Sequence, residues 1–410
     1  MGVAAFSTIV EWYDFTLYLY MATILSRVFF GGGATSLVTT LAGFAVAYLM
    51  RPLGAVVFGH IGDRWGRRPM MLGSMAVMSF AMLATALLPT YDQIGPVAGL
   101  LLLLLRCVMG FSVGGEYTGV VAYLMEGSRP GRRGLITSLA SAASEVGALI
   151  AVGTSALTVA MLSSIQLDSW GWRIPFLVGA VLAASIFLAR ATMQESPDFE
   201  RQRAAGTVPR QPLRHSLAHH RTGIGRSFAI SALGSITYYV GITYVPVFLT
   251  SAGAMTEGDS LWLSTIAALV VLLVTPLIGA LSDRVGRKPV LIGVALCGAL
   301  LPITMFSVMA GGSHGQALFG AIVLAGVGGA VSAVGAVATA EQFPGEGRLT
   351  GLALGATVAT AIFGGLTPYL AQLMMARTGW TSVPGIMIAL VALAVLPVLI
   401  RMPETNPRKA

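Results

Sequence analysis

Twelve long apolar segments dominate this chain and constrain its fold more than any other feature. Each reaches the ~20 residues that a helix needs to cross the hydrocarbon core of a bilayer. Six are expected in the first half, over residues 2–29, 37–59, 70–89, 95–125, 134–163 and 172–193. Six more are expected over residues 226–250, 261–280, 289–310, 315–342, 348–375 and 383–401. The pattern predicts an all-α polytopic membrane protein with twelve transmembrane helices.

The composition excludes a water-soluble globule. Of 410 residues, 55% are hydrophobic and 10% are charged, whereas soluble domains carry about 25% charged residues. The two cysteines lie inside apolar segments, and no Cys/His spacing indicates a metal. We therefore expect no enzyme, no catalytic residues, no cofactor and no metal site.

Basic residues are distributed unevenly between the connections. The connections after the even-numbered segments and the segment ends that border them, together with the C-terminal tail, hold 20 of the 25 Lys and Arg residues. Because basic loops stay in the cytoplasm, both termini are expected there, in a bacterial-type inner membrane. This asymmetry accounts for the net charge of +8, so no nucleic-acid partner is expected.

The two halves of the chain repeat one another. Residues 59–69 read GHIGDRWGRRP, and residues 279–289 read GALSDRVGRKP. We therefore expect an N-terminal six-helix bundle over 1–193, a cytoplasmic linker over 194–225 and a C-terminal six-helix bundle over 226–410. The repeated loops predict tight, gating turns in which the Asp accepts hydrogen bonds from a neighbouring helix N-terminus. The residues expected to form them are Gly59, Asp63, Arg64, Gly66, Arg67, Asp283, Arg284, Gly286 and Arg287.

The repeated loops resemble the signature of the major facilitator superfamily, and the chain resembles its metabolite:proton symporter family. Further resemblance lies in residues 11–15 (EWYDF), 50–54 (MRPLG), 106–117 and 170–176. It implies two six-helix bundles that rock around a central cavity in alternating access. Parts of the chain resemble citrate/tricarballylate and 2-oxoglutarate symporters, and others resemble proline/glycine-betaine symporters.

Ionisable side chains inside the membrane cost at least ~2.5–3.5 kcal/mol each and therefore call for a reason. Six are expected, all in the first half: Glu11, Asp14, Arg51, Arg106, Glu116 and Glu145. From the ~1.5 Å rise per residue, Glu11, Arg51 and Glu116 lie at one depth. We expect Glu11, Asp14 and Arg51 to form a cluster with Glu116 nearby, and Arg106 to meet Glu145 near the midplane.

Two interpretations of these charges stay open. They are neutralised pairs that stabilise the bundle, or at least one carboxylate takes up a proton when substrate engages its arginine. The candidates for proton coupling are Glu11, Asp14, Glu116 and Glu145. Arg51 and Arg106 are candidates for holding a substrate carboxylate, because guanidinium binds it through two parallel hydrogen bonds.

The second half contributes aromatic and hydroxyl groups. Tyr238 and Tyr239 precede Pro246, and Gly364 and Gly365 precede Thr367 and Pro368. These patterns predict interrupted helices whose polar groups face a cavity. With Tyr18, which shares a helix face with Asp14, they give the further substrate-binding candidates Tyr18, Tyr238, Tyr239 and Thr367.

The sequence thus predicts a proton-coupled symporter that imports a small carboxylate-bearing metabolite, favouring a di- or tricarboxylate such as citrate or 2-oxoglutarate. A proline/glycine-betaine proton symporter and an efflux carrier of the same fold remain alternatives. The expected partners are the substrate, protons and the lipid bilayer, with the chain acting as a monomer.

Overall fold

The computed structural model describes residues 2–65, 67–114, 121, 130–191, 200, 203–204, 218, 220–343 and 348–406. This part of the chain folds into helices joined by short turns, and it contains no strand. The first half comprises α1 (Gly2–Tyr20), α2 (Ala22–Phe30), α3 (Ala34–Leu49), α4 (Arg51–Trp65), α5 (Arg67–Ala86), α6 (Tyr91–Ile94), α7 (Val97–Ser112), η1 (Pro130–Arg132), α9 (Arg133–Met161), α10 (Ser164–Gln166), η2 (Leu167–Gly171) and α11 (Arg173–Ala191). The second half comprises α14 (Arg221–Tyr238), η3 (Tyr239–Thr243), α15 (Val245–Ser251), α16 (Glu257–Val285), α17 (Arg287–Met309), α18 (His314–Ala340), α19 (Arg348–Thr360), η4 (Ala361–Leu366), α20 (Thr367–Thr378) and α21 (Val383–Arg401).

The helices match the twelve expected spans. Within the described residues, nine helices are long and apolar enough to cross a membrane, and a tenth span is the pair Arg221–Thr243 and Val245–Ser251, bent by 46°. The other two are the shorter α7 and the first span, α1 with α2, which carries Glu11 and Asp14. The described residues thus supply twelve spans of a multi-pass membrane protein.

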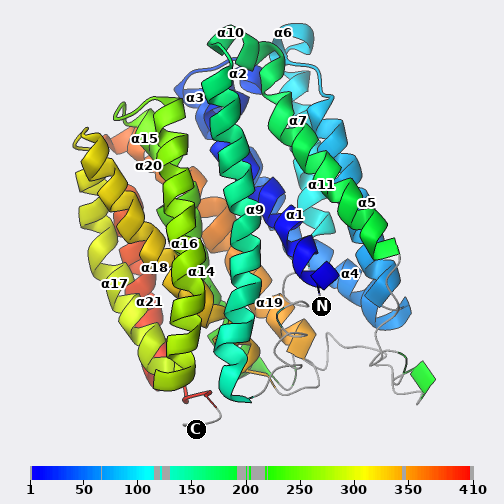
Figure 1. Cartoon of the computed structure of the whole chain (residues 1–410), viewed down its shortest axis with the longest axis vertical. Coiled ribbons are helices and arrows are strands. Elements are labelled where there is room, and N and C mark those ends of the chain that lie inside the picture. Colours follow the sequence, from blue (N-terminus) through cyan, green and yellow to red (C-terminus); the bar gives the residue numbers. More distant parts are fainter. Residues whose placement is uncertain are drawn as a thin grey trace.

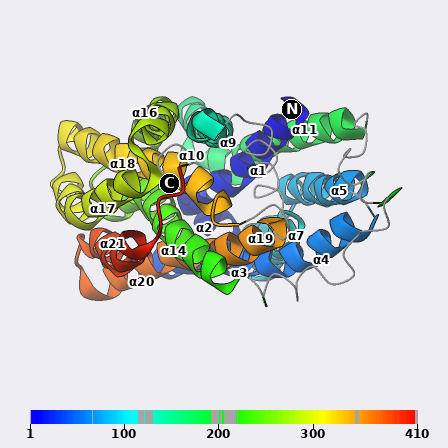
Figure 2. The same ribbon diagram turned by 90° about the horizontal axis from the view of Figure 1, so that it is seen from below.

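The two halves lie side by side and meet along α9 and α16, which pack against each other at the centre of the molecule (Figure 1). Seen from below, α17, α18 and α21 form the far edge of the second half, and α4, α5 and α11 that of the first (Figure 2). One end of the assembly carries Arg68, Arg133, Arg284 and Arg401, and we call it the basic face. The other end, which carries Arg27, Asp168 and Glu257, is called the opposite face.

The outward surfaces of the bundle are apolar. Large side chains there remain exposed in the isolated chain, at Phe80, Val181, Leu273, Leu277 and Leu300. Exposed apolar side chains of this kind are suited to contact lipid tails rather than water.

Two spans of the second half are interrupted by π-helical turns. The turn η3 lies just before Pro246, and η4, which contains Gly364 and Gly365, lies just before Pro368. Proline has no N–H to continue the α-helical hydrogen bonds, and π-turns of this kind often mark functional sites. The breaks predicted from sequence in these two spans are therefore confirmed.

Glycines bring the second and fourth spans into backbone contact. A Cβ on Gly110 would collide with the carbonyl oxygen of Ala47, and one on Gly54 with that of Phe111. Small residues at helix interfaces permit this close approach in membranes. The packing fixes the start of α4, and with it Arg51, next to α7.

Candidate functional site

Arg106 and Asp14 form a buried ion pair within the first half. The Arg106 Nη1 and Nη2 atoms donate to the two carboxylate oxygens of Asp14 at 2.9 and 3.1 Å. Both side chains are almost fully buried, and the Tyr18 ring lies 5.6 Å from the guanidinium carbon. Two expectations are wrong here: Arg106 pairs with Asp14 rather than Glu145, and Asp14 joins Arg106 rather than the cluster of Glu11 and Arg51.

Arg51 pairs with Glu11, as their common depth predicts. Arg51 Nη2 lies 3.0 Å from Glu11 Oε1. The guanidinium also lies over the rings of Phe15 and Tyr48, 4.0 and 4.6 Å from their centroids. Its Nε atom is buried and has no hydrogen-bond partner among the described residues. Arg51 therefore keeps donor capacity for a ligand.

Glu145 links the two halves of the molecule. It lies on α9, and its Oε2 accepts a hydrogen bond of 3.1 Å from the Tyr238 hydroxyl of α14. The carboxyl is buried, and no Lys, Arg or His of the described residues lies within ion-pair distance of it. A buried carboxyl group without a cation is poorly stabilised as an anion. Glu116, the other candidate, lies outside the described residues.

Aromatic rings surround these groups where η3 meets the first half. Trp12 packs edge-on against Tyr238 and stacks near Tyr239. The Tyr239 and Tyr48 hydroxyls share a hydrogen bond across the two halves. We call Trp12, Tyr48, Tyr238 and Tyr239 the aromatic cluster; all but Tyr48 line the same cavity as Arg51 and Glu145.

A cavity of about 150 Å³ lies below the aromatic cluster. Its lining reaches Thr339, at the last turn of α18, and Leu352, at the first turn of α19, so it extends toward the basic face. Among the described residues, its charged lining consists of Glu11, Arg51 and Glu145, all from the first half. The second half contributes hydroxyl groups, as expected: Ser231, Ser235, Tyr238, Tyr239, Ser332, Thr339, Thr357 and Thr360.

The structure thus brings five of the sequence candidates to one cavity: Glu11, Arg51, Glu145, Tyr238 and Tyr239. The other three described substrate candidates lie away from its lining. Arg106 is held by Asp14, the Tyr18 hydroxyl donates to the Thr40 carbonyl at 2.9 Å, and the Thr367 hydroxyl donates to the Phe363 carbonyl at 2.6 Å. Sequence reasoning did not single out Trp12 as a site residue. It predicted hydroxyl groups in the second half but not the individual Ser and Thr residues of the lining, because single Ser and Thr residues in apolar helices carry no spacing signal.

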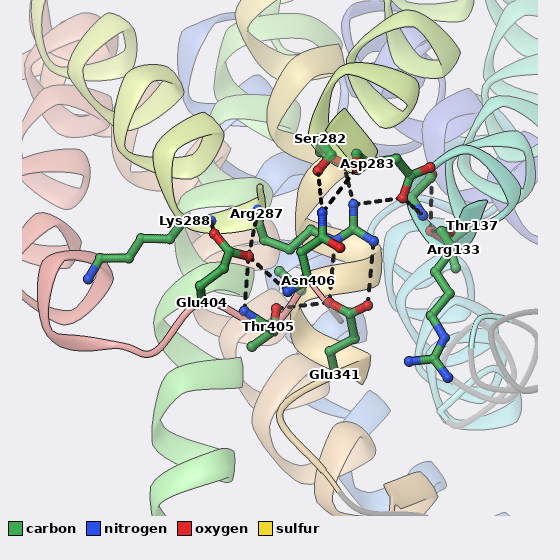
Figure 3. A network of polar contacts seen from close by, with 12 residues as sticks. Arg133, Thr137, Ser282, Asp283, Arg287, Lys288, Glu341, Glu404, Thr405 and Asn406 are labelled. Atoms are coloured by element: carbon green, nitrogen blue, oxygen red, sulfur yellow. Dashed lines mark hydrogen bonds and ion pairs between the residues drawn. The ribbon is translucent and has the colours of Figure 1, made fainter. Parts of the chain in front are cut away.

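The second signature loop forms a polar network at the basic face (Figure 3). The Asp283 carboxylate accepts hydrogen bonds of 2.9 Å from the backbone N–H groups of Gly134 and Leu135, at the N-terminus of α9. This is the helix-terminus contact that the motif predicts. Arg287 lies 2.9 Å from Asp283 and 3.3 Å from Glu341. The loop therefore connects the two halves where the cavity ends.

Gly286 makes the turn of this loop with a φ of +117°, and Arg284 is exposed beside it. Of the first loop, Gly66 lies outside the described residues. The surroundings of Gly59 and the side chains of Asp63, Arg64 and Arg67 are not described either. Their expected gating contacts stay predictions.

The C-terminal segment completes the network, which the sequence did not predict. The Glu404 carboxylate accepts hydrogen bonds from the backbone N–H groups of Arg287 and Lys288, at 2.8 and 3.1 Å. Burial raises the pKa of Glu404, but backbone donors, including those of Asn406 and Arg287, outweigh it and hold the pKa below its usual value. Asn406 Nδ2 donates to the Asp283 carbonyl at 3.1 Å. This segment is thus fastened across the start of α17.

No metal site accompanies these groups in the part of the chain that the structure describes: no three His, Cys, Asp or Glu side chains gather there. The site offers a guanidinium, carboxyl groups, hydroxyls and aromatic rings. By their chemistry, such groups can bind a small polar molecule and exchange a proton.

Comparison with known proteins defines the class. The family model "Sugar (and other) transporter" matches residues 1–207, and "Major Facilitator Superfamily" matches residues 233–410. The proton:xylose symporter XylE has the same fold, with a TM-score of 0.78 at 20% identity over 98% of this chain and 95% of that one. The two bundles are those of a major facilitator transporter.

Relatives at higher identity narrow the family. The chain is 34% identical to the alpha-ketoglutarate permease of Escherichia coli K12, over 90% of this chain and 85% of that protein. It is 32% identical to the citrate-proton symporter of Klebsiella pneumoniae, over 92% and 85%. It is 31% identical to the ectoine/proline transporter ProP of Corynebacterium glutamicum, over 97% and 82%. The chain belongs to the major facilitator superfamily, within its metabolite:proton symporters.

Proposed function

We propose that this chain is a proton-coupled symporter that imports a small carboxylate-bearing metabolite by alternating access. Relatives named for alpha-ketoglutarate and for citrate with protons support this choice. The membrane is the bacterial inner membrane, the basic face is cytoplasmic as positive-inside loops favour, and the carrier works as a monomer. No catalytic step or cofactor is required, since the coupling ion is H⁺.

The observation that carries the proposal is the state of Arg51. Within the part of the chain that the structure describes, Arg51 lines the cavity, pairs with Glu11 and has a buried Nε with no hydrogen-bond partner. A substrate carboxylate satisfies these donors through a charge-assisted pair. Binding then draws Arg51 away from Glu11, so substrate and Glu11 compete for one guanidinium.

Glu145 couples this binding to protons. With Glu11 and Glu145 ionised, the described cavity lining carries two negative charges and one positive charge, which opposes an anionic substrate. Protonation of Glu145 removes one negative charge. Because Glu145 also bonds to Tyr238 of the other half, its protonation state acts on the contact between the halves. Proton and anion therefore enter together.

A zwitterionic substrate is the second candidate, and the same cavity favours it for a different reason. Trp12, Tyr238 and Tyr239 present ring faces near the Glu145 carboxyl, and such groups stabilise an ammonium through cation–π contact. The relative named for ectoine and proline has this type of substrate. Among the described residues the cavity lining has one guanidinium, which suits one carboxylate better than three.

Uptake by the purified protein in liposomes tests the proposal. Radiolabelled 2-oxoglutarate, citrate, proline and glycine betaine are offered with an acidic exterior, with and without a protonophore. We expect accumulation of one class that collapses with the protonophore. Accumulation that ignores the proton gradient, or gradient-driven export in place of uptake, contradicts the proposal.

A further inference from the structure

Arg27 joins the two halves at the opposite face, away from the cavity and the signature loops. Its Nη1 and Nη2 atoms donate to the Glu257 carboxylate at 2.6 and 3.2 Å. Its Nε and Nη2 atoms donate to Asp168 at 3.1 Å each. One guanidinium thus holds two carboxylates, in the geometry that makes arginine pairs strong and directional.

The three residues come from different parts of the fold. Arg27 lies in the last turn of α2, and Asp168 lies in η2, so both belong to the first half. Glu257 is the first residue of α16 in the second half. An arginine near a helix C-terminus and a glutamate at a helix N-terminus are each favoured by the helix dipole. Asp168 orients Arg27 within its own half, and Glu257 is the contact between the halves.

Side chains of both halves pack together beside this triad and leave no room for a water molecule between them. Among them are Thr23 of α2, Thr250 of α15 and Glu257 itself. The large cavity lies on the other side of the aromatic cluster, toward the basic face. The triad therefore lies where the two halves are packed against each other.

The side chains of the triad are partly exposed to water. The side chains of Arg27, Asp168 and Glu257 are 35%, 37% and 21% exposed, so water screens their attraction and solvates them when they part. The buried pair of Arg106 and Asp14 has no such access. A contact that breaks in every cycle needs this partial exposure.

We propose that Arg27 is the latch of a gate at the opposite face. It binds Glu257 while the cavity faces the basic side, and it releases Glu257 when the halves part on its own side. Asp168 keeps the released guanidinium in place for the next closure. The inference rests on the alternating access proposed above, but it concerns the gate and not the substrate.

Thiol labelling from the opposite face tests the latch without any substrate. Cys107 and Cys297 are replaced by serine, and Thr250→Cys places one thiol among the partly buried side chains packed beside the triad. A membrane-impermeant maleimide is added to vesicles that expose this face. We expect Arg27→Gln and Glu257→Gln to speed labelling by about tenfold, Arg27→Lys by less, and Asp168→Asn by less than Glu257→Gln.

Arg377→Gln is the matched control. Arg377 ends α20 near the same face and is exposed, so the substitution removes the same charge without touching the triad. Its labelling rate is expected to equal that of the parent, and melting curves confirm that each variant is folded. Equal rates for Glu257→Gln and Arg377→Gln overturn the latch, as does a larger effect of Asp168→Asn than of Glu257→Gln. Labelling that changes while uptake of every tested metabolite stays absent supports the latch and counts against the proposed function alone.

Discussion

Arg106 binds Asp14 through two parallel hydrogen bonds, 2.9 and 3.1 Å long, between two side chains that are almost fully buried. Removing one partner leaves the other as an uncompensated buried charge, at a cost of about 3–5 kcal/mol. We therefore expect Arg106→Gln to lower the melting temperature strongly. The double variant Asp14→Asn with Arg106→Gln should be more stable than Arg106→Gln alone. Thermal unfolding in detergent measures both, and additive losses would contradict the pairing.

Arg51→Lys tests the carboxylate site. Lysine keeps the charge but loses the planar fork, so the Kd of the transported metabolite should rise by about 10–100-fold, the equivalent of one charged hydrogen bond. Glu11→Gln, by contrast, should leave the Kd unchanged or lower it, because it removes the competitor for Arg51. Calorimetric titration measures both values. Arg284→Lys, at an exposed position, is the control. A higher Kd in Glu11→Gln than in Arg51→Lys would contradict the competition of substrate and Glu11 for Arg51.

Gly365→Ala tests the close packing of the π-turn in the eleventh span. A Cβ at this position would collide with the side chain of Tyr48 in the other half. Overpacking of this kind costs about 1–3 kcal/mol, and it should slow transport because η4 and α3 could no longer approach each other. Gly153→Ala is the control, since no heavy atom lies within 4 Å of its added Cβ. If Gly365→Ala and Gly153→Ala have the same initial uptake rate and melting temperature, close packing of Gly365 against Tyr48 is not needed for transport or stability.

Glu404→Gln tests the fastening of the C-terminal segment. The pKa of Glu404 is lower in the folded chain than in the unfolded one, so its contribution is present above the unfolded pKa of about 4.3 and is lost as the pH falls below it. We expect the variant to be about 1 kcal/mol less stable at neutral pH, after allowance for solvent screening. The difference in melting temperature should hold between pH 8 and about 5.5 and shrink below about 4.3. A difference that grows on acidification would contradict the sign of the pKa shift.

The sequence predicted the spans and part of the site because both follow from distances along single helices. Glu11 and Arg51 lie at the same depth in neighbouring spans, and depth follows from the rise per residue. The rotation of each helix about its axis does not follow from this rise, so the sequence wrongly places Asp14 with Arg51 and Arg106 with Glu145. Gly364, Gly365 and Pro368 marked the broken span through their own backbone chemistry.

Contacts between distant connections carried no such signal. Arg27 precedes Asp168 by 141 residues and Glu257 by 230 residues. No local pattern distinguishes these three residues from ordinary charged residues at helix ends. Glu404 and Asn406 also belong to no motif that points to Arg287 or Asp283. Only the fold brings these residues together.

The most direct test of the account is proton-driven accumulation by Glu145→Gln in liposomes. Glutamine can still accept the hydrogen bond of Tyr238 but takes up no proton, so the variant should exchange metabolite across the membrane in counterflow. It should fail to concentrate that metabolite when the exterior is acidic, whereas the parent concentrates it several-fold. Accumulation by Glu145→Gln equal to that of the parent, at the same pH difference, would contradict the assignment of the coupling proton to this carboxyl group.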